Sequence, residues 1–156
     1  MKELKITAKI RVYDYNELNP VEKKLIDSAK EAVQRAYVPY SHFQVGAAVL
    51  LNNNEIITGN NQENAAFPSG LCAERIALFY ANSRFPDAAV DAIAVAACTD
   101  EDFTDNPITP CGACRQVILE AQNRYKHPVK TILYGKKAVY VIEQITDLLP
   151  LAFETF

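Results

Sequence analysis

The sequence predicts an α/β fold, a three-layer α-β-α sandwich around a mixed sheet of about five strands. Segments with the periodicity of strands alternate with segments of helical periodicity along most of the chain. Val90–Cys98 is apolar at nearly every position, which is typical of a central strand covered on both faces. A length of 156 residues suits one domain, so we assign residues 1–156 to a single domain.

The N-terminal part is expected to form a strand and then a helix. Leu4–Val12 places an apolar residue at every second position, which is a strand pattern. Asn19 is a good N-cap, Pro20 suits the first helical position, and Glu22 lies three residues after the cap. The helix that follows is expected to end at Pro39. The residues expected on one face of it are Val21, Leu25, Ala29, Ala32 and Ala36.

The next segments predict a hairpin and a second helix. Gln44–Leu51 and Glu55–Gly59 have the composition of strands, and Asn52–Asn54 between them is a turn cluster. A helix is expected from about Cys72 to Ser83, ahead of the central strand. The residues expected on its inward face are Ile76, Phe79 and Tyr80.

The C-terminal third is expected to contain a loop, a helix, two strands and a short last helix. Asp100–Pro110 has the composition of a polar loop. Gly112–Tyr125 is expected to be helical, and Val129–Tyr134 and Ala138–Ile142 are expected to be strands. Glu143–Leu149 is expected to form the short last helix. The inward-facing residues of the longer helix are expected to be Val117, Ile118 and Ala121.

Composition and charge indicate the class of partner. The formal net charge is −3, and no block of five or more like charges or stripe of Lys and Arg occurs, so we expect no nucleic-acid polymer as a partner. No segment approaches the ~18 consecutive apolar residues of a membrane span, and the N-terminal segment lacks the apolar centre of a signal peptide. We therefore expect a cytoplasmic protein with a small-molecule substrate and no membrane partner. In that compartment its four cysteines are expected to be free or metal-bound.

Three cysteines and one glutamate carry the chemical signal. Cys72 lies two residues before Glu74, and a later Pro-Cys-x-x-Cys motif contains Cys111 and Cys114. Three thiolates are suitable ligands for zinc, and a centre with three protein ligands keeps its fourth position for water, as catalytic zinc sites do. Beside such a water, Glu74 can accept a proton and return it. The alternative for Glu74 is an ordinary first-turn glutamate favoured by the helix dipole.

The placement of the cysteines is consistent with thiolate ligands. Both segments are expected at helix N-termini, where the dipole favours anions and lowers the pKa of a thiol. Cys111 and Cys114 are three residues apart, so they share one helix face. Zinc with three thiolates carries a formal charge of −1, which Arg75 would offset by hydrogen-bonding to sulfur. A solvated helix arginine is an equally good interpretation of Arg75.

Other cysteines and histidines leave alternatives open. A Cys-x-x-Cys pair also fits a redox motif, although a third cysteine with a glutamate at a fixed offset has no redox explanation. Cys98 ends the most apolar strand and is expected to be a buried, small apolar side chain. If Cys98 or His127 were a fourth ligand, the site would be closed and structural. His42 and His127 are otherwise expected to be packed or surface residues.

Three further segments, together with the cysteine motifs, resemble the cytidine deaminase family. Ala36–Ala48 is similar to the family's Tyr-x-Pro-Tyr-Ser-x-Phe-x-Val-Gly-Ala segment, and Gly59–Ala65 is similar to its Asn-x-Glu-Asn segment. Leu148–Phe153 is similar to its C-terminal Leu-Leu-Pro-x-x-Phe segment. The chain thus resembles the zinc-dependent, single-domain, homotetrameric type of cytidine deaminase.

The resemblance implies a cofactor and an activity. It implies one zinc ion per subunit, with the positions of Cys72, Cys111 and Cys114 as ligands. It also implies hydrolytic deamination of cytidine and 2′-deoxycytidine to uridine and 2′-deoxyuridine with release of ammonia, as in pyrimidine salvage. In the family, the match to Glu74 carries protons for a zinc-bound hydroxide, and the match to Arg75 contacts the cysteine sulfurs.

The resemblance further implies a nucleoside site that is completed at the subunit interfaces of a homotetramer. The matches to Asn61 and Glu63 hold the ribose 3′-hydroxyl, and the match to Phe43 packs on the pyrimidine. The match to Phe153 reaches the site of a neighbouring subunit. We expect the main-chain N–H of Ala73 to bind the carbonyl of the base.

Two departures from the family and two rival functions remain. Phe67 stands where some relatives have Tyr, and the N-terminal strand and Asp100–Pro110 are longer than in compact members. One rival is a deaminase of an aminocytosine antibiotic such as blasticidin S, against which the pair Asn61 and Glu63 weighs. The other is a non-catalytic, zinc-stabilised binding module, which would require a fourth protein ligand.

Overall fold

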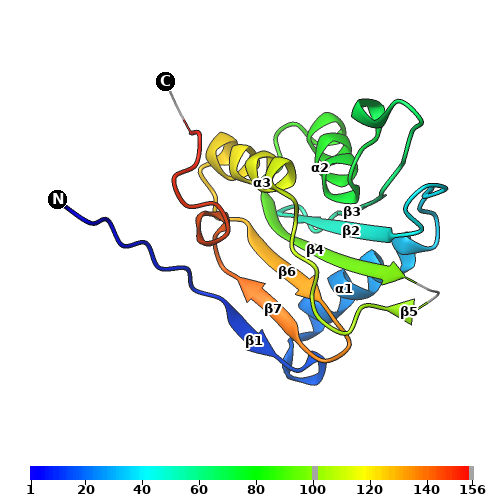
Figure 1. Ribbon diagram of the computed structural model, residues 1–156, viewed down its shortest axis with the longest axis horizontal. Coiled ribbons are helices and arrows are strands. Elements are labelled where there is room, and N and C mark those ends of the chain that lie inside the picture. Colours follow the sequence, from blue (N-terminus) through cyan, green and yellow to red (C-terminus); the bar gives the residue numbers. More distant parts are fainter. Residues whose placement is uncertain (100–101, 155–156) are drawn as a thin grey trace.

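The computed structural model describes residues 1–99 and 102–154, which form one mixed sheet between layers of helices (Figure 1). The α-helices are α1 (Pro20–Val33), α2 (Ala73–Arg84) and α3 (Gly112–Tyr125). The strands are β1 (Arg11–Tyr13), β2 (Gln44–Leu51), β3 (Ile56–Asn60), β4 (Val90–Thr99), β5 (Asp102–Phe103), β6 (Lys130–Tyr134) and β7 (Val139–Ile142). Short 3-10 turns are η1 (Tyr15–Glu17), η2 (Phe67–Ser69) and η3 (Ile145–Asp147).

The sheet has the order β1-β7-β6-β4-β2-β3, and β5 pairs with the end of β4. The pair β4–β6 is parallel, and β4 pairs antiparallel with β2 on its other side, so the sheet is mixed. Helix α1 covers one face, and α2 and α3 cover the other (Figure 1). The predicted three-layer sandwich is therefore confirmed, although its sheet has seven strands rather than about five.

β1 and β5 are short and lie at the margins of the sheet, and only β5 lies outside the predicted strands. β5 occupies part of the predicted loop Asp100–Pro110, where Phe103 pairs with Cys98. Asp100 and Glu101 lie outside the described residues. At the N-terminus the predicted strand Leu4–Val12 is wrong for most of its length. β1 pairs through Arg11 with Val141, one residue before β7 ends, so the residues ahead of it have no β7 partner and extend away from the domain (Figure 1).

The start of α1 follows from its capping residues. Asn19 accepts a hydrogen bond from the main-chain N–H of Glu22 at 2.9 Å, and the Glu22 carboxylate accepts the N–H of Asn19 at 3.3 Å. The helix ends at Val33, ahead of the predicted stop at Pro39. Of the predicted inward residues, Leu25, Ala29 and Ala32 are buried, Ala36 follows the helix and is half-buried, and Val21 is exposed.

The remaining elements differ from the prediction in one important respect. The hairpin, the central strand, α3 and the last two strands lie within a residue or two of their predicted bounds, and the predicted last helix is the turn η3. In α3, Ile118 and Ala121 are buried as predicted. In α2, however, Phe79 and Tyr80 are 48% and 57% exposed, so their predicted inward orientation is wrong. The side chains of α2 that are buried belong to Ala73, Glu74, Ala77, Leu78 and Ala81.

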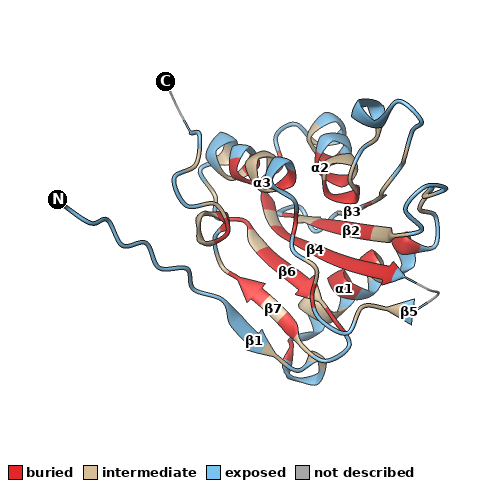
Figure 2. Ribbon diagram, in the orientation of Figure 1, coloured by how far each residue is buried: buried red, intermediate tan, exposed pale blue. Residues whose placement is uncertain are grey.

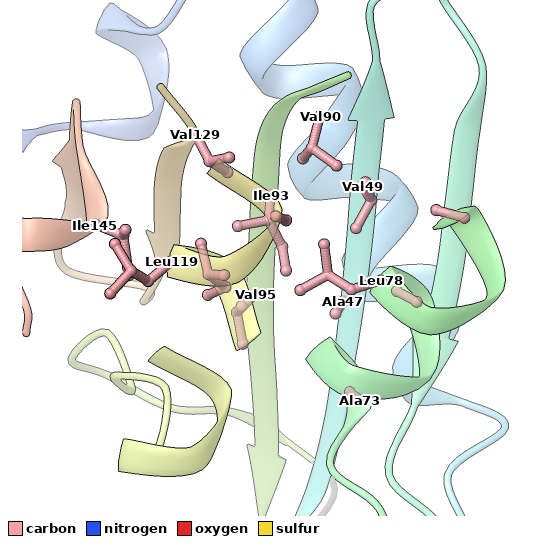
Figure 3. Packing of buried hydrophobic residues seen from close by; sticks show 14 of the residues in the cluster. Ala47, Val49, Ala73, Leu78, Val90, Ile93, Val95, Leu119, Val129 and Ile145 are labelled. Atoms are coloured by element: carbon pink, nitrogen blue, oxygen red, sulfur yellow. The ribbon is translucent and has the colours of Figure 1, made fainter. Parts of the chain in front are cut away.

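Two apolar cores lie on the two faces of the sheet (Figure 2). Alternate residues of β4 serve each core, with Ile93 and Val95 on the α2/α3 side and Ala94 and Ala96 on the α1 side. Figure 3 shows Ile93 and Val95 packed between β2 and α3. Because β4 is buried on both faces, it forms the rigid centre from which the two site-bearing helices are positioned.

Residues of η1, β5 and β6 gather around Lys30 of α1. The Nζ of Lys30 lies 4.7 Å from the ring centre of Tyr134, 5.2 Å from that of Phe103 and 5.8 Å from that of Tyr15. Tyr15 belongs to η1, directly after β1, and Phe103 belongs to β5. Cation–π contacts of roughly 0.5–2 kcal/mol each therefore tie both segments to the helix.

Two glycines allow the helices to approach the sheet closely. A Cβ on Gly59 of β3 would lie 2.6 Å from the carbonyl oxygen of Ala73 and 2.6 Å from the nitrogen of Ala77, both in α2. A Cβ on Gly46 of β2 would lie 2.1 Å from the carbonyl oxygen of Ala29 in α1. The atoms in the way are main-chain atoms, so a side chain at either position would displace a whole helix. This close contact also explains why Ala73 and Ala77, and not the aromatic residues of α2, lie against β3.

We predict that Gly59→Ala moves the N-terminus of α2 and weakens zinc binding through Cys72, which caps that end of the helix. Overpacking of this kind lowers the free energy of unfolding by about 1–3 kcal/mol. Gly46→Ala is the matched control, because it disturbs α1, which carries none of the cysteines. Thermal unfolding and competition with a zinc chelator measure the two effects. Wild-type zinc affinity in Gly59→Ala would contradict this role of the α2–β3 contact.

Candidate metal centre and active site

Three cysteine side chains meet at the N-terminal ends of α2 and α3. The sulfur atoms of Cys72, Cys111 and Cys114 all lie within 4.8 Å of one another. The separation is 3.5 Å between Cys111 and Cys114 and 3.9 Å between Cys72 and Cys111. Tetrahedral zinc with Zn–S bonds of about 2.3 Å places its sulfur ligands about 3.8 Å apart. The three thiols therefore have the spacing that zinc requires.

The local backbone explains how the thiols converge. Cys72 is the N-cap of α2 and Cys111 is the N-cap of α3, both with extended backbone angles, while Cys114 lies in the first turn of α3. A side chain at an N-cap lies off the end of its helix, so ligands from two helices reach one point. The N–H groups of a first helical turn have no acceptor within the helix. Their positive field stabilises thiolates, as expected from the sequence.

The proposed fourth ligands lie elsewhere. Within the described residues, the group of metal-ligating side chains around this point has three members, Cys72, Cys111 and Cys114. Cys98 is buried in the core on the α1 face, on the other side of the sheet, which confirms its predicted burial. The Nε2 of His127 lies 2.9 Å from the carboxylate of Asp91. The described residues therefore supply three ligands to this cluster and leave a fourth coordination position without a protein ligand.

Charge within the cluster is balanced by hydrogen bonds. The pKa of Cys72 is lowered to about 5, chiefly by a hydrogen bond from Cys114 and further by Arg75, whose Nη2 lies 3.6 Å from its sulfur. The pKa of Cys114 is strongly raised, because it shares its proton with Cys72 and is also buried. A cation bound among the sulfurs would replace this shared proton. Of the two interpretations of Arg75, the structure therefore supports the arginine that contacts sulfur.

Glu74 is a buried carboxyl beside the thiols. It is the second residue of α2 and only 4% exposed. Burial raises its pKa above the ordinary value, and the negative charge of Cys72 acts in the same direction. The carboxyl lies outside the group of three ligand atoms. A carboxyl with a raised pKa, next to a metal site, is suited to take up and release protons.

A cavity of about 510 Å³ connects this cluster with the predicted sugar-binding residues. Asn61 and Glu63, which follow β3, line it together with Cys72 and Arg75. Phe67 lines it as well, 76% exposed, with its ring centre 6.0 Å from that of Tyr40. Cavities of a few hundred Å³ are typical of small-molecule sites.

The polar residues of the cavity are bound to the segment that precedes β2. The side chain of Asn61 accepts the N–H of Val45 at 2.8 Å and donates to the carbonyl of Phe43 at 2.9 Å. The carboxylate of Glu63 accepts the N–H groups of Tyr40 and Ser41 at 2.9 and 3.2 Å. Hydrogen bonds, chiefly from the Ser41 side chain, lower the pKa of Glu63. Glu63 is therefore an anion that is anchored and still has acceptor capacity.

The other predicted site residues differ in burial and in their position relative to the cavity. Ala73 is the buried first residue of α2, between Cys72 and Glu74. Phe43 is half-buried at the entry to β2. Phe153 is 68% exposed in the C-terminal segment, where its carbonyl accepts from Gln116 of α3 at 2.6 Å. It does not line the cavity of its own subunit.

Three supporting residues were not predicted from the sequence. Tyr40 and Ser41 bind Glu63 through their main-chain N–H groups, for which a sequence carries little signal. Arg115, next to Cys114, donates to the carbonyl of Pro110 at 2.8 Å and to that of Leu148 at 2.7 Å. It thereby fixes the chain just before Cys111. The sequence did contain a signal for Arg115, because an arginine follows each cysteine motif: Arg75 follows Cys72 closely, and Arg115 follows Cys114 directly.

A three-layer sandwich with three thiols and a buried carboxyl at two helix ends is the arrangement of a zinc-dependent hydrolase. Comparisons with known proteins narrow this class. Residues 20–128 match the family described as the cytidine and deoxycytidylate deaminase zinc-binding region. The chain therefore belongs to the cytidine and deoxycytidylate deaminase family, which confirms the resemblance noted in the sequence.

Individual relatives agree with this assignment. Cytidine deaminase of Halalkalibacterium halodurans is 44% identical over 131 residues, which are 83% of this chain and 91% of the relative. The crystal structure of cytidine deaminase from Burkholderia pseudomallei has a TM-score of 0.72 at 41% identity and covers 83% of this chain and 97% of its own. The crystal structure of cytidine deaminase from Mycobacterium tuberculosis has a TM-score of 0.66 at 32% identity and covers 85% and 96%.

The buried carboxyl predicts a pH-dependent stability difference. The folded-state pKa of Glu74 is raised, so its contribution to stability is fully present below the unfolded value near 4.5 and is lost as the pH rises through the folded value. In chelator-treated protein, Glu74→Gln should therefore melt at a higher temperature than the wild type at pH 8, by about 2–4 °C for each kcal/mol gained. The two proteins should melt together below pH 4.5. The matched control is Glu120→Gln, at an exposed glutamate of α3, which should melt as the wild type does at both pH values. Equal melting temperatures of Glu74→Gln and wild type at pH 8 would contradict the claim that the buried Glu74 charge destabilises the fold.

Proposed function

We propose that this protein hydrolyses cytidine and 2′-deoxycytidine to uridine and 2′-deoxyuridine, with release of ammonia. The observation that carries the proposal is the three-thiol cluster beside buried Glu74, opening onto a cavity that contains Asn61 and Glu63. Relatives named cytidine deaminase that share up to 44% identity support the same reaction. We also propose a role in pyrimidine salvage, in the cytoplasm.

The thiolates of Cys72, Cys111 and Cys114 are proposed to hold one zinc ion per subunit. Their sulfur spacing fits tetrahedral zinc, and the three protein ligands leave one position open. Zinc supplies one chemical function here, which is to lower the pKa of a water molecule so that it becomes a nucleophile at neutral pH. Arg75 offsets the excess negative charge of three thiolates through its contact with Cys72.

Glu74 is proposed to move the protons of the reaction. Its carboxylate takes a proton from the attacking water and delivers it to N3 of the base as the new C4–O bond forms. It then takes the remaining proton from the new C4 hydroxyl and transfers it to the exocyclic amine, so that the C4=O bond forms, the C4–N bond breaks and ammonia leaves. A pKa raised by burial suits both steps, because the group must accept and donate near neutral pH.

Substrate binding is proposed to use the residues around the cavity. Phe43 packs on the pyrimidine, and the main-chain N–H of Ala73, in the first turn of α2, binds the carbonyl of the base. Asn61 and Glu63 bind the 3′-hydroxyl of the sugar. Asn61 and Glu63 each retain hydrogen-bonding capacity after their contacts with the protein. The negative charge of Glu63 would repel a phosphate near the sugar, which favours nucleosides over nucleotides.

The active form is proposed to be a homotetramer with sites at subunit interfaces. Phe79 and Tyr80 of α2, Phe67 beside the cavity and Phe153 in the C-terminal segment all expose large apolar area. Covering such side chains with a second copy of the chain lowers the free energy, because it removes apolar surface from water. Phe153 does not line the cavity of its own subunit and is 68% exposed, and we propose that its side chain reaches the cavity of a neighbouring subunit. No helix among the described residues is long and apolar enough to cross a membrane.

Ammonia release tests the proposed reaction directly. The panel contains cytidine, 2′-deoxycytidine, cytosine, 2′-deoxycytidine monophosphate and blasticidin S. Both nucleosides are expected to react far faster than the other three compounds. Faster turnover of blasticidin S would assign the antibiotic-deaminase function instead.

Replacing the proton carrier should abolish turnover without loss of the metal. We expect Glu74→Gln to bind zinc as the wild type does, while kcat for cytidine falls by about 10²–10⁴. The matched control is Glu120→Gln, an exposed glutamate of α3, which should keep full activity. Zinc content and initial rates are measured on the same preparation. A zinc-loaded Glu74→Gln enzyme with near-normal kcat would end this mechanism.

The tetramer predicts that α2 cannot tolerate charge on its outer face. Tyr80→Asp should dissociate the assembly in sedimentation velocity and reduce activity with it. Val21→Asp, an exposed apolar position on α1, should leave the assembly intact. A wild-type protein that sediments as a fully active monomer would refute the proposed assembly.

A further inference from the structure

The two ends of the proposed nucleoside site meet in one short segment of the chain. Tyr40–Phe43 lies between α1 and β2, and it presents Phe43, the residue proposed to pack on the base. Its main-chain N–H groups at Tyr40 and Ser41 both donate to Oε2 of Glu63, the carboxylate proposed to bind the sugar. The position of one binding residue is therefore coupled to that of the other.

Ser41 is the residue that makes this link in both directions. Its main-chain N–H donates to Oε2 of Glu63 at 3.2 Å. Its hydroxyl accepts the main-chain N–H of Phe43 at 3.1 Å. The same hydroxyl also stabilises the ionised form of Glu63, since the hydrogen bond from Ser41 is the largest cause of the lowered pKa of that carboxyl. Ser41 thus contacts the neighbours on the base side and on the sugar side of the cavity that it lines.

The backbone between these contacts is held in an unfavourable conformation. His42, which separates Ser41 from Phe43, has a φ of 54°, in the left-handed region. A residue other than glycine in this region costs on the order of 1 kcal/mol and persists only where its surroundings enforce it. The hydrogen bond from Phe43 to the Ser41 hydroxyl and the bond from the N–H of His42 to the carbonyl of Val38 at 3.1 Å provide this enforcement. Loss of the Ser41 hydroxyl would release one of the two.

Asn61 holds the far end of the same segment. It binds the carbonyl of Phe43 and the N–H of Val45, so the peptide groups on both sides of Gln44 are fixed. Phe43 is consequently bound through its N–H by Ser41 and through its carbonyl by Asn61. Of the two residues that bind Phe43, Ser41 is the one that also binds Glu63 among the described residues.

We propose that Ser41 is a positioning residue for nucleoside deamination, which fixes Glu63 and Phe43 relative to each other so that the enzyme recognises the 3′-hydroxyl and the base together. The proposal rests on the proposed function of the cavity. Ser41 itself need not touch the substrate. Its removal would leave the base-packing and sugar-binding residues present but no longer held in one arrangement, and recognition of the sugar hydroxyl would weaken first.

The test compares two substrates that differ only at the 3′ position. The ratio of kcat/KM for 2′-deoxycytidine to that for 2′,3′-dideoxycytidine is measured in the wild type, Ser41→Ala and Ser41→Thr. We expect Ser41→Ala to lower this ratio by about tenfold. This is the size of effect expected when one hydrogen bond to a charged group, here the Glu63 carboxylate, is lost. Ser41→Thr, which keeps the hydroxyl, should retain the wild-type ratio. The matched control is Ser28→Ala, because the Ser28 hydroxyl donates to the carbonyl of Lys24 within α1.

The outcomes separate this proposal from the general function. A ratio in Ser41→Ala equal to that of the wild type overturns the role of Ser41, while deamination itself stands. A wild-type protein that releases no ammonia from any nucleoside overturns the proposed function and this proposal with it. Zinc content and melting temperature are measured for each variant, since a change in ratio at unchanged zinc content is not produced by general damage to the metal site. If Ser41→Ala fails to fold, Ser41→Cys serves in the same comparison.

Discussion

The meeting of three thiols at the N-termini of α2 and α3 is the interaction on which the rest of the structure depends. Sulfur atoms less than 4.8 Å apart cannot all ionise unless positive charge is supplied. Two helix ends and the guanidinium of Arg75 supply part of it, and the low pKa of Cys72 reports their effect together with the proton of Cys114. The remaining demand is for a cation, which supports the proposed zinc centre beside buried Glu74.

This geometry depends in turn on how the helices are seated on the sheet. Helix α2 lies against β3 at Gly59, where no side chain separates the two backbones, and it turns Ala73 and Ala77 inward. The close contact brings Glu74 below the surface and leaves Phe79 and Tyr80 outside. The same close packing thus buries Glu74, which is proposed to carry protons, and exposes Phe79 and Tyr80, which are proposed to contact other subunits.

The sequence predicted those features that depend on near neighbours in the chain. The capping residues of α1, the apolar strand β4 and the spacing of the cysteines are local patterns, and each had the expected outcome. The inner face of α2 was mispredicted because hydrophobicity favoured the aromatic residues, whereas the close approach of Gly59, on a distant strand, places Ala73 and Ala77 against the sheet. The bonds that join Ser41 to Glu63 span 22 residues and use a main-chain N–H, so no residue pattern announces them.

The central claim is that Cys72, Cys111 and Cys114 hold a zinc ion whose fourth position is open to water. X-ray absorption spectroscopy at the zinc edge, on the full chain in solution, tests it most directly. Three sulfur ligands at about 2.3 Å and one oxygen at about 2.0 Å are expected. A fourth sulfur, or a histidine nitrogen in place of the oxygen, would contradict an open catalytic centre and identify a closed structural one.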